Sequence, residues 1–336
     1  MTSRPRVAIT GLGAVTGVVS GGADAVARAI SGGATADGER IDRTLAELIG
    51  PADARRLSRV CQLTLAAARL ALADAGLADG GGLGVIVGTE LGDLRSTIAF
   101  ADGYLSRGPG GLSPLLFPNT VMNTMAAATA IAVTAREASL TIDAPTVAGE
   151  LAVARAAASV AAGRMPAALA GGVDEIDPLV AAVLDEVGGR FVARGEGAAF
   201  LVLEPLEAAE ARGARVLGEI RGVASGALPA APHAVGRRTT PRVIEQALAR
   251  AGAGVESLRA VFTGESGDAR RDAWEARVLE AGAPRVPHGP AIARQFGHTS
   301  AVGPLKVAAA AATAPALVHG LARGGTHVAL VVGAGR

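Results

Sequence analysis

The chain has 336 residues, half of them apolar, a formal net charge of +1 and a single cysteine, Cys61. This length is enough to bury a large core, so stability need not come from disulfide bonds or metal ions. One cysteine rules out an internal disulfide framework and a cysteine metal cluster. The near-neutral charge, with no basic run, gives no reason to expect nucleic acid or an anionic membrane as a partner.

The longest apolar stretch, VAAAAATAPALV from Val307, is shorter than the roughly 18 to 20 residues of a membrane helix and contains Pro315. The N-terminus runs directly into a strand pattern, without the charged and apolar regions of a secretion signal. We therefore expect a cytoplasmic protein with no membrane segment.

Strand-like and helix-like segments alternate along the first part of the chain, which predicts an α/β protein whose sheets are covered by helices. The expected elements, in chain order, are a strand at 7–15, a helix at 57–77, a strand at 83–89, a helix at 119–135, a strand at 139–143 and a helix at 150–163. A strand at 167–175 and a strand passing into a helix at 197–214 complete this first series.

The later part of the chain repeats this order in shortened form. Its expected elements are a strand at 216–225, a helix at 241–251, a strand at 258–264, a helix around Trp274, an alanine-rich helix after His298 and a strand at 326–333. A duplicated unit is therefore predicted, with halves at 1–205 and 206–336 that divide near Pro205 and pack as one compact body.

The glycine pair GLG at residues 11–13 follows the first strand, as in dinucleotide-binding folds. The third glycine is not at the required spacing, and no acidic residue ends a second strand about 20 positions later. We expect no nucleotide cofactor.

Several blocks together resemble the ketosynthases of the thiolase superfamily. They are VAITGLGAVT, LALADAGL followed by GVIVGTELG, AALAGGVDE, RGEGAAFLVLEPLEAAEARGA and FGHTSAVGPLKVAAAAATAPALVHG, and they occur in the family's order. The resemblance implies a thiolase-like fold, with duplicated α/β halves in a layered αβαβα architecture. It also implies condensation chemistry, which requires a thiol nucleophile at a strand-to-helix turn and two histidines.

Thr146 stands where the family's cysteine belongs, in the block DAPTVAG. A threonine hydroxyl is a far weaker nucleophile than a thiolate unless a base removes its proton. A helix dipole contributes only about 0.3 to 1 kcal/mol and does not make up the difference. One interpretation is that Thr146 caps or packs the start of the following helix. The other is that Thr146, with His298 as base, forms an ester intermediate.

The block AVFTGESGDARRDAWE keeps the family's acidic pair as Asp272 and Glu275 but has Gly264 in place of the first histidine. The second histidine is retained as His298, although Ala293 replaces the lysine five residues earlier. With neither thiol nor second histidine, His298 is expected to be a hydrogen-bonded structural residue.

The family's late GFGGTN turn reads ARGGTH here, so Arg323 replaces the phenylalanine of the gate loop and His327 replaces the asparagine. The remaining histidines, His233, His288 and His319, have no motif around them and are expected on the surface or in loops.

These losses together resemble the chain length factor, the ketosynthase beta subunit of type II polyketide synthases. The resemblance implies a non-catalytic subunit in a heterodimer with an active ketosynthase. It implies no cofactor or metal of its own, because the partner acts on phosphopantetheine thioesters of acyl carrier protein. Two segments that are typical of the family are missing from this sequence, one between residues 189 and 190 and one after Gly320. We therefore expect acyl carrier protein to bind mainly through the partner.

The resemblance also places the wall of a chain-length tunnel at Gly92, Arg95 and Ala99, whose spacing predicts one helical face. The methionines Met122 and Met125 lie in the neighbouring helix. Gly92 and Ala99 leave room for a long chain, whereas Arg95 needs a partner, since an unpaired buried charge is costly. The other interpretations are an ordinary packed helix with Arg95 in solvent, and a homodimeric pseudoenzyme that acts as a scaffold. A reduced, polyene-like product is favoured over an aromatic one.

Overall fold

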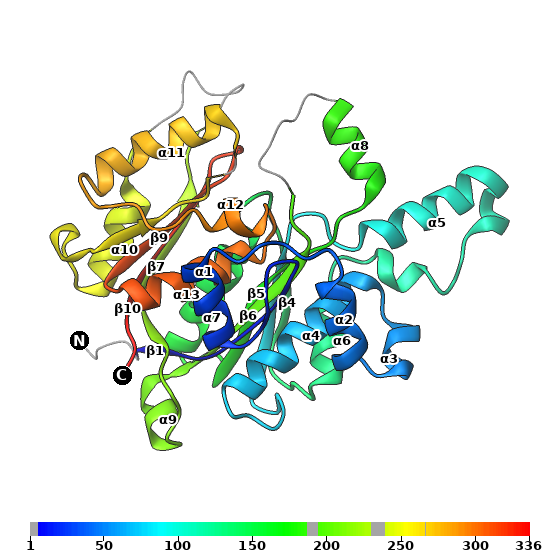
Figure 1. The fold of residues 1–336 in the computed structure, drawn as a ribbon, viewed down its shortest axis with the longest axis horizontal. Helices are drawn as coiled ribbons and strands as arrows, with labels where there is room; N and C mark the ends of the chain where they lie inside the picture. Colours follow the sequence, from blue (N-terminus) through cyan, green and yellow to red (C-terminus); the bar gives the residue numbers. More distant parts are fainter. Residues whose placement is uncertain (1–5, 187–193, 230–238, 266) are drawn as a thin grey trace.

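A computed structural model describes residues 6–186, 194–229, 239–265 and 267–336. In this part of the chain the strands form one mixed sheet in the order β4-β3-β5-β6-β1-β7-β10-β9-β8, with β2 beside β1 (Figure 1). The strands are β1 Val7–Thr16, β2 Ser20–Gly21, β3 Leu83–Thr89, β4 Ser139–Asp143, β5 Ala167–Asp174, β6 Gly197–Pro205, β7 Gly218–Ala227, β8 Ala260–Phe262, β9 Ala316–Leu321 and β10 Thr326–Ala334.

Helices connect and cover these strands (Figure 1). The α-helices are α1 Ala23–Gly32, α2 Arg40–Leu48, α3 Pro51–Arg56, α4 Arg59–Asp74, α5 Leu94–Arg107, α6 Thr124–Ala132, α7 Ala148–Ala161, α8 Pro178–Glu186, α9 Leu206–Ala211, α10 Arg242–Ala251, α11 Ala269–Gly282, α12 Ile292–Phe296 and α13 Val302–Thr313. The 3-10 helices are η1 Gly108–Gly111, η2 Phe117–Thr120 and η3 Val255–Ser257.

Among the described residues the hydrophobic core has three large clusters that follow the layers and a small fourth one of Ala8, Leu206, Ala209 and Val216. Helices α7 and α13 form the central set with the inner faces of the strands. Helices α4 and α6 pack on the outer face of the first strands, and α10 and α11 pack on the outer face of the later ones. This is a layered α/β arrangement with helices between and outside the sheet surfaces. The predicted αβαβα architecture is confirmed.

The central strands are buried on both faces because helices cover both sides. Every residue of β1 is buried, which explains why its sequence is a nearly continuous apolar run. An ideal Cβ on Gly11 or Gly13 would lie only 2.4 Å or 2.2 Å from a backbone oxygen of α4. These glycines therefore let α4 approach β1 closely, which gives the GLG pair a packing role.

The strand order mirrors itself about the contact between β1 and β7. Outward from this contact, the strands of the first half follow in the order β1, β6, β5 and β3. Those of the second half follow in the corresponding order β7, β10, β9 and β8. The first half adds β4 at the outer edge, whereas no equivalent strand follows β8 among the described residues. This symmetry supports the predicted duplication, and the division at Pro205 remains a prediction.

Two expected helices have different limits in the structure. The predicted helix at 57–77 begins at Arg59 and ends at Asp74. The predicted helix at 119–135 is instead the short turn η2 followed by α6, which starts only at Thr124. The proline at position 118 stands at the start of η2, where its fixed φ suits a first turn but its missing N–H prevents it from extending a helix.

No helix in the described ranges is long and apolar enough to cross a membrane. The same ranges contain no group of three or more histidine, cysteine, aspartate or glutamate residues that could hold a metal ion.

Candidate functional site

The candidate site lies where β3, β4 and β5 end and α7 begins. Strand β4 ends at Asp143 and α7 starts at Ala148, so Thr146 lies in the turn that joins them. Its φ of 65° is in the left-handed region, which a β-branched residue rarely adopts. The strand and the helix on either side hold this conformation, and the residue is half-buried.

The hydroxyl of Thr146 has no partner. Its Oγ1 is buried and accepts or donates no hydrogen bond among the described residues. The N-cap of α7 is Val147, and no side chain caps this helix. The expectation that Thr146 caps α7 is therefore wrong, because its hydroxyl bonds to none of the first N–H groups of this helix. The other part of that interpretation, that Thr146 packs at the start of α7, remains.

Replacing Thr146 by glycine is expected to raise the free energy of unfolding by about 1 kcal/mol, because glycine adopts a positive φ without strain and removes a buried, unpaired hydroxyl. Thermal or urea unfolding measures this change. The matched substitution Thr97→Gly, inside α5, is expected to lower stability by about 1 kcal/mol. A loss of stability in Thr146→Gly would show that the hydroxyl has a stabilising partner.

His298 is buried beside Glu90, with its Nε2 atom 3.5 Å from a carboxylate oxygen. Arg194 lies on the other side of this carboxylate at 3.1 Å. Burial alone would raise the pKa of Glu90, but His298 and Arg194 outweigh it and hold that pKa below its usual value. His298 thus faces a carboxylate, and no hydrogen bond joins it to Thr146 among the described residues. The position of His298 agrees with a structural role.

Asp174, at the end of β5, ties these segments together. Its carboxylate accepts hydrogen bonds from the Thr89 hydroxyl at 2.9 Å, the Glu90 N–H at 2.8 Å and the Ser300 N–H at 2.7 Å. One buried carboxylate therefore fixes the backbone next to both Glu90 and His298.

At Gly264, the space that a side chain would take is filled by Arg271. An ideal Cβ on Gly264 would lie 1.9 Å from Nη2 of Arg271, and the Gly264 N–H donates to the carboxylate of Glu275. The Arg271 guanidinium also donates to Glu275 at 2.7 Å and to the Leu321 carbonyl at 2.6 Å. A histidine at position 264 would have to displace this guanidinium.

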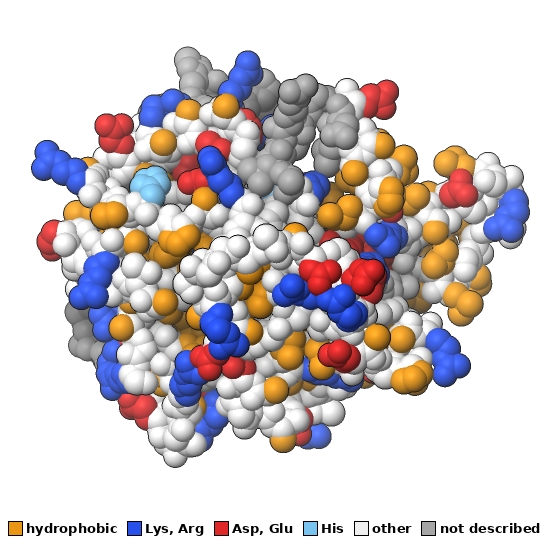
Figure 2. Space-filling model, in the orientation of Figure 1, with side chains coloured by type: hydrophobic (Ala, Val, Ile, Leu, Met, Phe, Trp, Pro, Cys, Tyr) orange, Lys and Arg blue, Asp and Glu red, His pale blue; other side chains and the backbone are white. Residues whose placement is uncertain are grey.

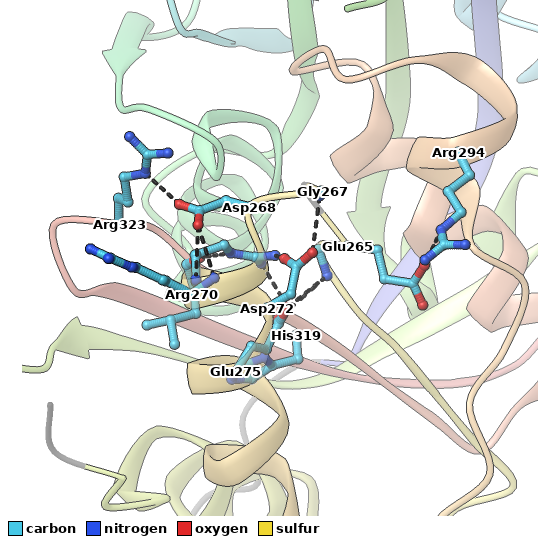
Figure 3. A network of polar contacts seen from close by, with 12 residues as sticks. Glu265, Gly267, Asp268, Arg270, Asp272, Glu275, Arg294, His319 and Arg323 are labelled. Atoms are coloured by element: carbon cyan, nitrogen blue, oxygen red, sulfur yellow. Dashed lines mark hydrogen bonds and ion pairs between the residues drawn. The ribbon is translucent and has the colours of Figure 1, made fainter. Parts of the chain in front are cut away.

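Glu275 connects Arg271 to two buried histidines. Figure 3 shows Glu275 next to the first of them, His319. His319 Nδ1 lies 2.7 Å from a Glu275 oxygen, and His319 Nε2 lies 2.6 Å from Nε2 of His327, so one proton lies between the rings. Burial alone would raise the pKa of Glu275, but Arg271 and His319 lower it to about 2. Burial and the neighbouring His319 lower the pKa of His327 to about 3, so this ring is neutral.

These contacts correct two expectations. His319 is fully buried, not on the surface, because β9 runs through the interior and directs it toward α11. His327 is a fully buried residue of β10 and not part of a gate loop. Arg323 does lie in the exposed turn between these strands, where its guanidinium pairs with Asp268 (Figure 3). His288 is exposed as predicted, and His233 lies outside the described residues.

A second buried ion pair lies between the two central helices. Lys306 of α13, the only lysine of the chain, pairs with Glu150 in the first turn of α7. Its ammonium group also donates to the His319 carbonyl at 3.1 Å. Both side chains are almost completely buried, so this pair links α7 to α13 directly behind the Thr146 turn.

The predicted tunnel residues do not share one helical face. Gly92 lies before α5, whose N-cap is Asp93. Its φ is 65°, and its N–H donates to the Thr89 hydroxyl in a tight turn. Arg95 and Ala99 do lie one turn apart on α5, and both are exposed. Arg95 is partnered: it donates to the Ile176 carbonyl and lies 3.6 Å from Glu175.

The two methionines lie in different surroundings. Met122 is 40% exposed and its sulfur is near the position of a Cβ on Gly92. Met125 is buried in the cluster formed with α4 and β3. Of the predicted tunnel set, only Met122 therefore lies next to Gly92, and Met125 is a core residue. The point between residues 189 and 190 where a family segment is missing lies outside the described residues.

Glu175, at the base of α5, predicts a pH dependence of stability. Its carboxylate accepts a hydrogen bond from the Arg95 N–H, but burial raises the pKa of Glu175 to about 7. The native state therefore holds a proton that the unfolded state releases above the ordinary glutamate pKa of 4.5. Stability is expected to fall by about 3 kcal/mol as the pH rises from about 4.5 to 7.

Urea unfolding of Glu175→Gln across this pH range tests the assignment. The variant is expected to lack this fall, because glutamine does not titrate. Glu137→Gln, at an exposed position, is the matched control and is expected to keep it. An unchanged pH profile in Glu175→Gln would assign the fall to another group.

The family becomes clear from comparison with known proteins. A family model described as the N-terminal domain of beta-ketoacyl synthase matches residues 27–209. Because this range is more than half of the chain, the protein belongs to the beta-ketoacyl synthase family. The matched range includes Thr146 but ends before Gly264, so the assignments of Thr146 to the nucleophile position and of Gly264 to a histidine position stay predictions.

Two curated relatives are named 3-oxoacyl-(acyl-carrier-protein) synthase 2. The protein of Synechocystis sp. is 28% identical over 261 residues, which cover 66% of this chain and 62% of the relative. That of Vibrio harveyi is 27% identical over 205 residues, covering 54% and 49%. The matched parts thus span about half to three-fifths of these relatives.

Solved structures share the fold over almost the whole chain. The ishigamide ketosynthase/chain length factor superposes with a TM-score of 0.81 at 22% identity, covering 98% of this chain and 99% of the other. A type II polyketide synthase acyl carrier protein in complex with its ketosynthase gives 0.76 at 18%, covering 98% and 100%. A beta-ketoacyl synthase from Burkholderia phymatum gives 0.74 at 21%, covering 99% and 100%.

Proposed function

We propose that this chain is a non-catalytic chain length factor that pairs with an active ketosynthase of a type II polyketide synthase. The observation that carries the proposal is the guanidinium of Arg271, which fills the space of the missing histidine at Gly264. The Thr146 hydroxyl supports it, because no residue that the structure describes hydrogen-bonds to this hydroxyl as a base would. The names of two structural neighbours describe a ketosynthase with a chain length factor and a ketosynthase with acyl carrier protein.

An exposed apolar surface supports the pairing with a partner. Figure 2 shows hydrophobic side chains gathered over α5 and α8. Most of the exposed large apolar residues of the described chain lie on α5, on α8 and in the segment between α5 and α6, and the full set is Tyr104, Leu105, Leu112, Leu115, Phe117, Val121, Met122, Ile131, Leu140, Leu179 and Val183. Monomeric proteins rarely expose so many large apolar side chains together, so this surface suits burial against another subunit.

In this proposal, α5 closes the far end of the partner's acyl tunnel, with Ala99 and the ion-paired Arg95 on the face turned toward the growing chain. The partner contacts acyl carrier protein and acts on its phosphopantetheine thioesters. The chain needs no cofactor or metal and works in the cytoplasm. The product favoured is a reduced, polyene-like chain.

Co-expression with a ketosynthase that has an intact cysteine and two histidines tests the proposal. The two chains are expected to co-purify in equal amounts, and Ala99→Phe is expected to shorten the product. Ala101→Phe, exposed on a different face of α5, is the matched control and is expected to leave the length unchanged. The competing acyltransferase function would be supported by an acyl adduct on Thr146 of the isolated chain in mass spectrometry.

A further inference from the structure

A hollow of about 350 Å³ lies between α1 and α13, which pack against each other beside the sheet (Figure 1). Its floor consists of buried apolar side chains of the strands, among them Ile9 and Leu12 of β1, Leu201 of β6 and Phe262 of β8. None of the residues that line it belongs to the candidate functional site. The hollow is therefore a separate cavity of the described chain.

The alanine-rich sequence of α13 leaves this space open. Every residue of α13 that lines the hollow is an alanine, except Thr313 at the end of the helix. On the facing side, α1 contributes Val26, Ala27 and Ile30. Protein interiors are otherwise closely packed, and pockets for small ligands begin at about 300 Å³. A space of this size with an apolar lining is therefore suited to a small apolar ligand.

The polar side chains of the lining lie at the mouth of the hollow. They are Asp24, Ser31, Arg215 and Thr313, and all four residues are exposed, whereas the buried residues of the lining are apolar. The hydroxyls of Ser31 and Thr313 donate to carbonyl oxygens of their own helices. A ligand that fits this lining has an apolar body inside and a polar end at the mouth.

Arg215 keeps unused hydrogen-bond donors at this mouth. Its Nη2 atom donates to Asp24 at 2.8 Å, and the guanidinium makes no other hydrogen bond or ion pair with the described residues. The nearby Asp74 carboxylate accepts hydrogen bonds from the N–H groups of Leu12 and Ala23. Because a guanidinium has several donors in a planar fork that fits a carboxylate, Arg215 can bind a second carboxylate and keep Asp24.

The volume of the hollow indicates the length of the ligand. A volume of about 350 Å³ holds about twelve groups of the size of a liquid water molecule, at about 30 Å³ each. A saturated carboxylate with about ten carbon atoms has about this number of non-hydrogen atoms. Each CH₂ group that moves from water into the apolar floor adds to the affinity, so an alkyl chain is favoured over a polar one.

We propose that this hollow binds a medium-chain aliphatic carboxylate, whose alkyl chain lies between α1 and α13 and whose carboxylate binds Arg215. An alkylamine is a poorer fit, because the Asp24 carboxylate already pairs with Arg215 and is also close to the positive charge of Arg28. The proposal does not depend on the proposed function, since the hollow is built from this chain alone and shares no residue with the candidate functional site.

Isothermal titration calorimetry of the full chain with sodium decanoate, below its micelle concentration, tests the proposal. Decanoate is expected to bind saturably, with one molecule per chain. From hexanoate to decanoate the affinity is expected to rise about fourfold for each added CH₂ group, and dodecanoate is expected to gain no more, because the hollow is full. Decanol and decylamine are each expected to bind at least tenfold more weakly than decanoate.

Two variants at exposed positions of the lining assign the binding to this hollow. Ala27→Phe places a bulky ring at the mouth, and Arg215→Gln removes the cation, so each is expected to weaken decanoate binding at least tenfold. Arg215→Gln is also expected to abolish the preference for decanoate over decanol. Ala273→Phe and Arg277→Gln, at exposed positions of α11, are the matched controls and are expected to bind decanoate as the wild type does.

Thermal unfolding without ligand checks that all four variants keep the fold. The proposal is wrong if decanoate does not bind saturably, if the affinity keeps rising beyond decanoate, or if decylamine binds more tightly. Equal affinities in Ala27→Phe and Ala273→Phe, or in Arg215→Gln and Arg277→Gln, would also overturn it. None of these results affects the proposed function, which fails instead if no ketosynthase co-purifies or if Thr146 becomes acylated.

Discussion

Replacing Arg271 by methionine is expected to lower the free energy of unfolding by about 3 to 5 kcal/mol, because it leaves the carboxylate of Glu275 buried without its cation. The Arg271 side chain is 2% exposed, and its guanidinium bonds to Glu275 and to the Leu321 carbonyl. Methionine has a similar length but cannot donate to either. Urea unfolding at pH 7 measures the loss.

Two further variants separate charge from packing. Arg277→Met, on the exposed side of the same helix, is expected to change stability by no more than about 0.5 kcal/mol. The double variant Arg271→Met, Glu275→Leu is expected to recover part of the loss, because it removes both charges from the interior. A loss below about 1 kcal/mol in Arg271→Met would mean that Glu275 is stable without the guanidinium.

The variant Thr146→Cys is expected to create a reactive thiol at the turn before α7, while Cys61 stays unreactive. A helix N-terminus lowers the pKa of a thiol, whereas burial raises the pKa of Cys61 to about 11. Labelling with iodoacetamide at pH 8, followed by mass spectrometry, is expected to modify residue 146 about a hundredfold faster than Cys61. Equal labelling of both residues would mean that the turn does not activate a thiol.

The thiol alone is not expected to condense acyl and malonyl units, because position 264 has no histidine. Adding Gly264→His is expected to destabilise the protein by about 3 kcal/mol and to leave condensation undetectable, because the new side chain collides with Arg271. Gly324→His is the matched control, since its Cβ meets no atom within 4 Å. Condensation by the double variant Thr146→Cys, Gly264→His would show that the site needs only these two side chains.

The sequence predicted the elements whose patterns are local. Strand β4 matches the prediction residue for residue, and the turn at Thr146 follows it as expected. The interpretation of Gly264 as the position of a lost histidine also depends on the order of residues in one block, and it stays a prediction. The layered fold followed from the alternation of strands and helices.

The residues that the sequence did not single out are those whose partners lie far away along the chain. His319 meets Glu275 across 44 positions, and Lys306 meets Glu150 across the two central helices. Lys306 and His319 both lie in the block FGHTSAVGPLKVAAAAATAPALVHG, but nothing in its local pattern marks either pairing, since a buried ion pair leaves no local periodicity. A single lysine within the alanine-rich helix α13 was the one signal available for Lys306, because a lone cation in an apolar helix requires a buried partner.

The sequence by itself determined the class of fold, because the alternation of strands and helices depends on residue types in short segments. The assignments of Thr146 to a nucleophile position and of Gly264 to a histidine position come from such segments too, and they stay predictions. Only the tertiary structure decided that Arg271 fills the space at Gly264 and that His319 and His327 are buried together. It also decided that Gly92 lies outside α5 and that arginines line the hollow beside β4. The physical reason is that burial and charge pairing arise between segments that meet only when the chain folds.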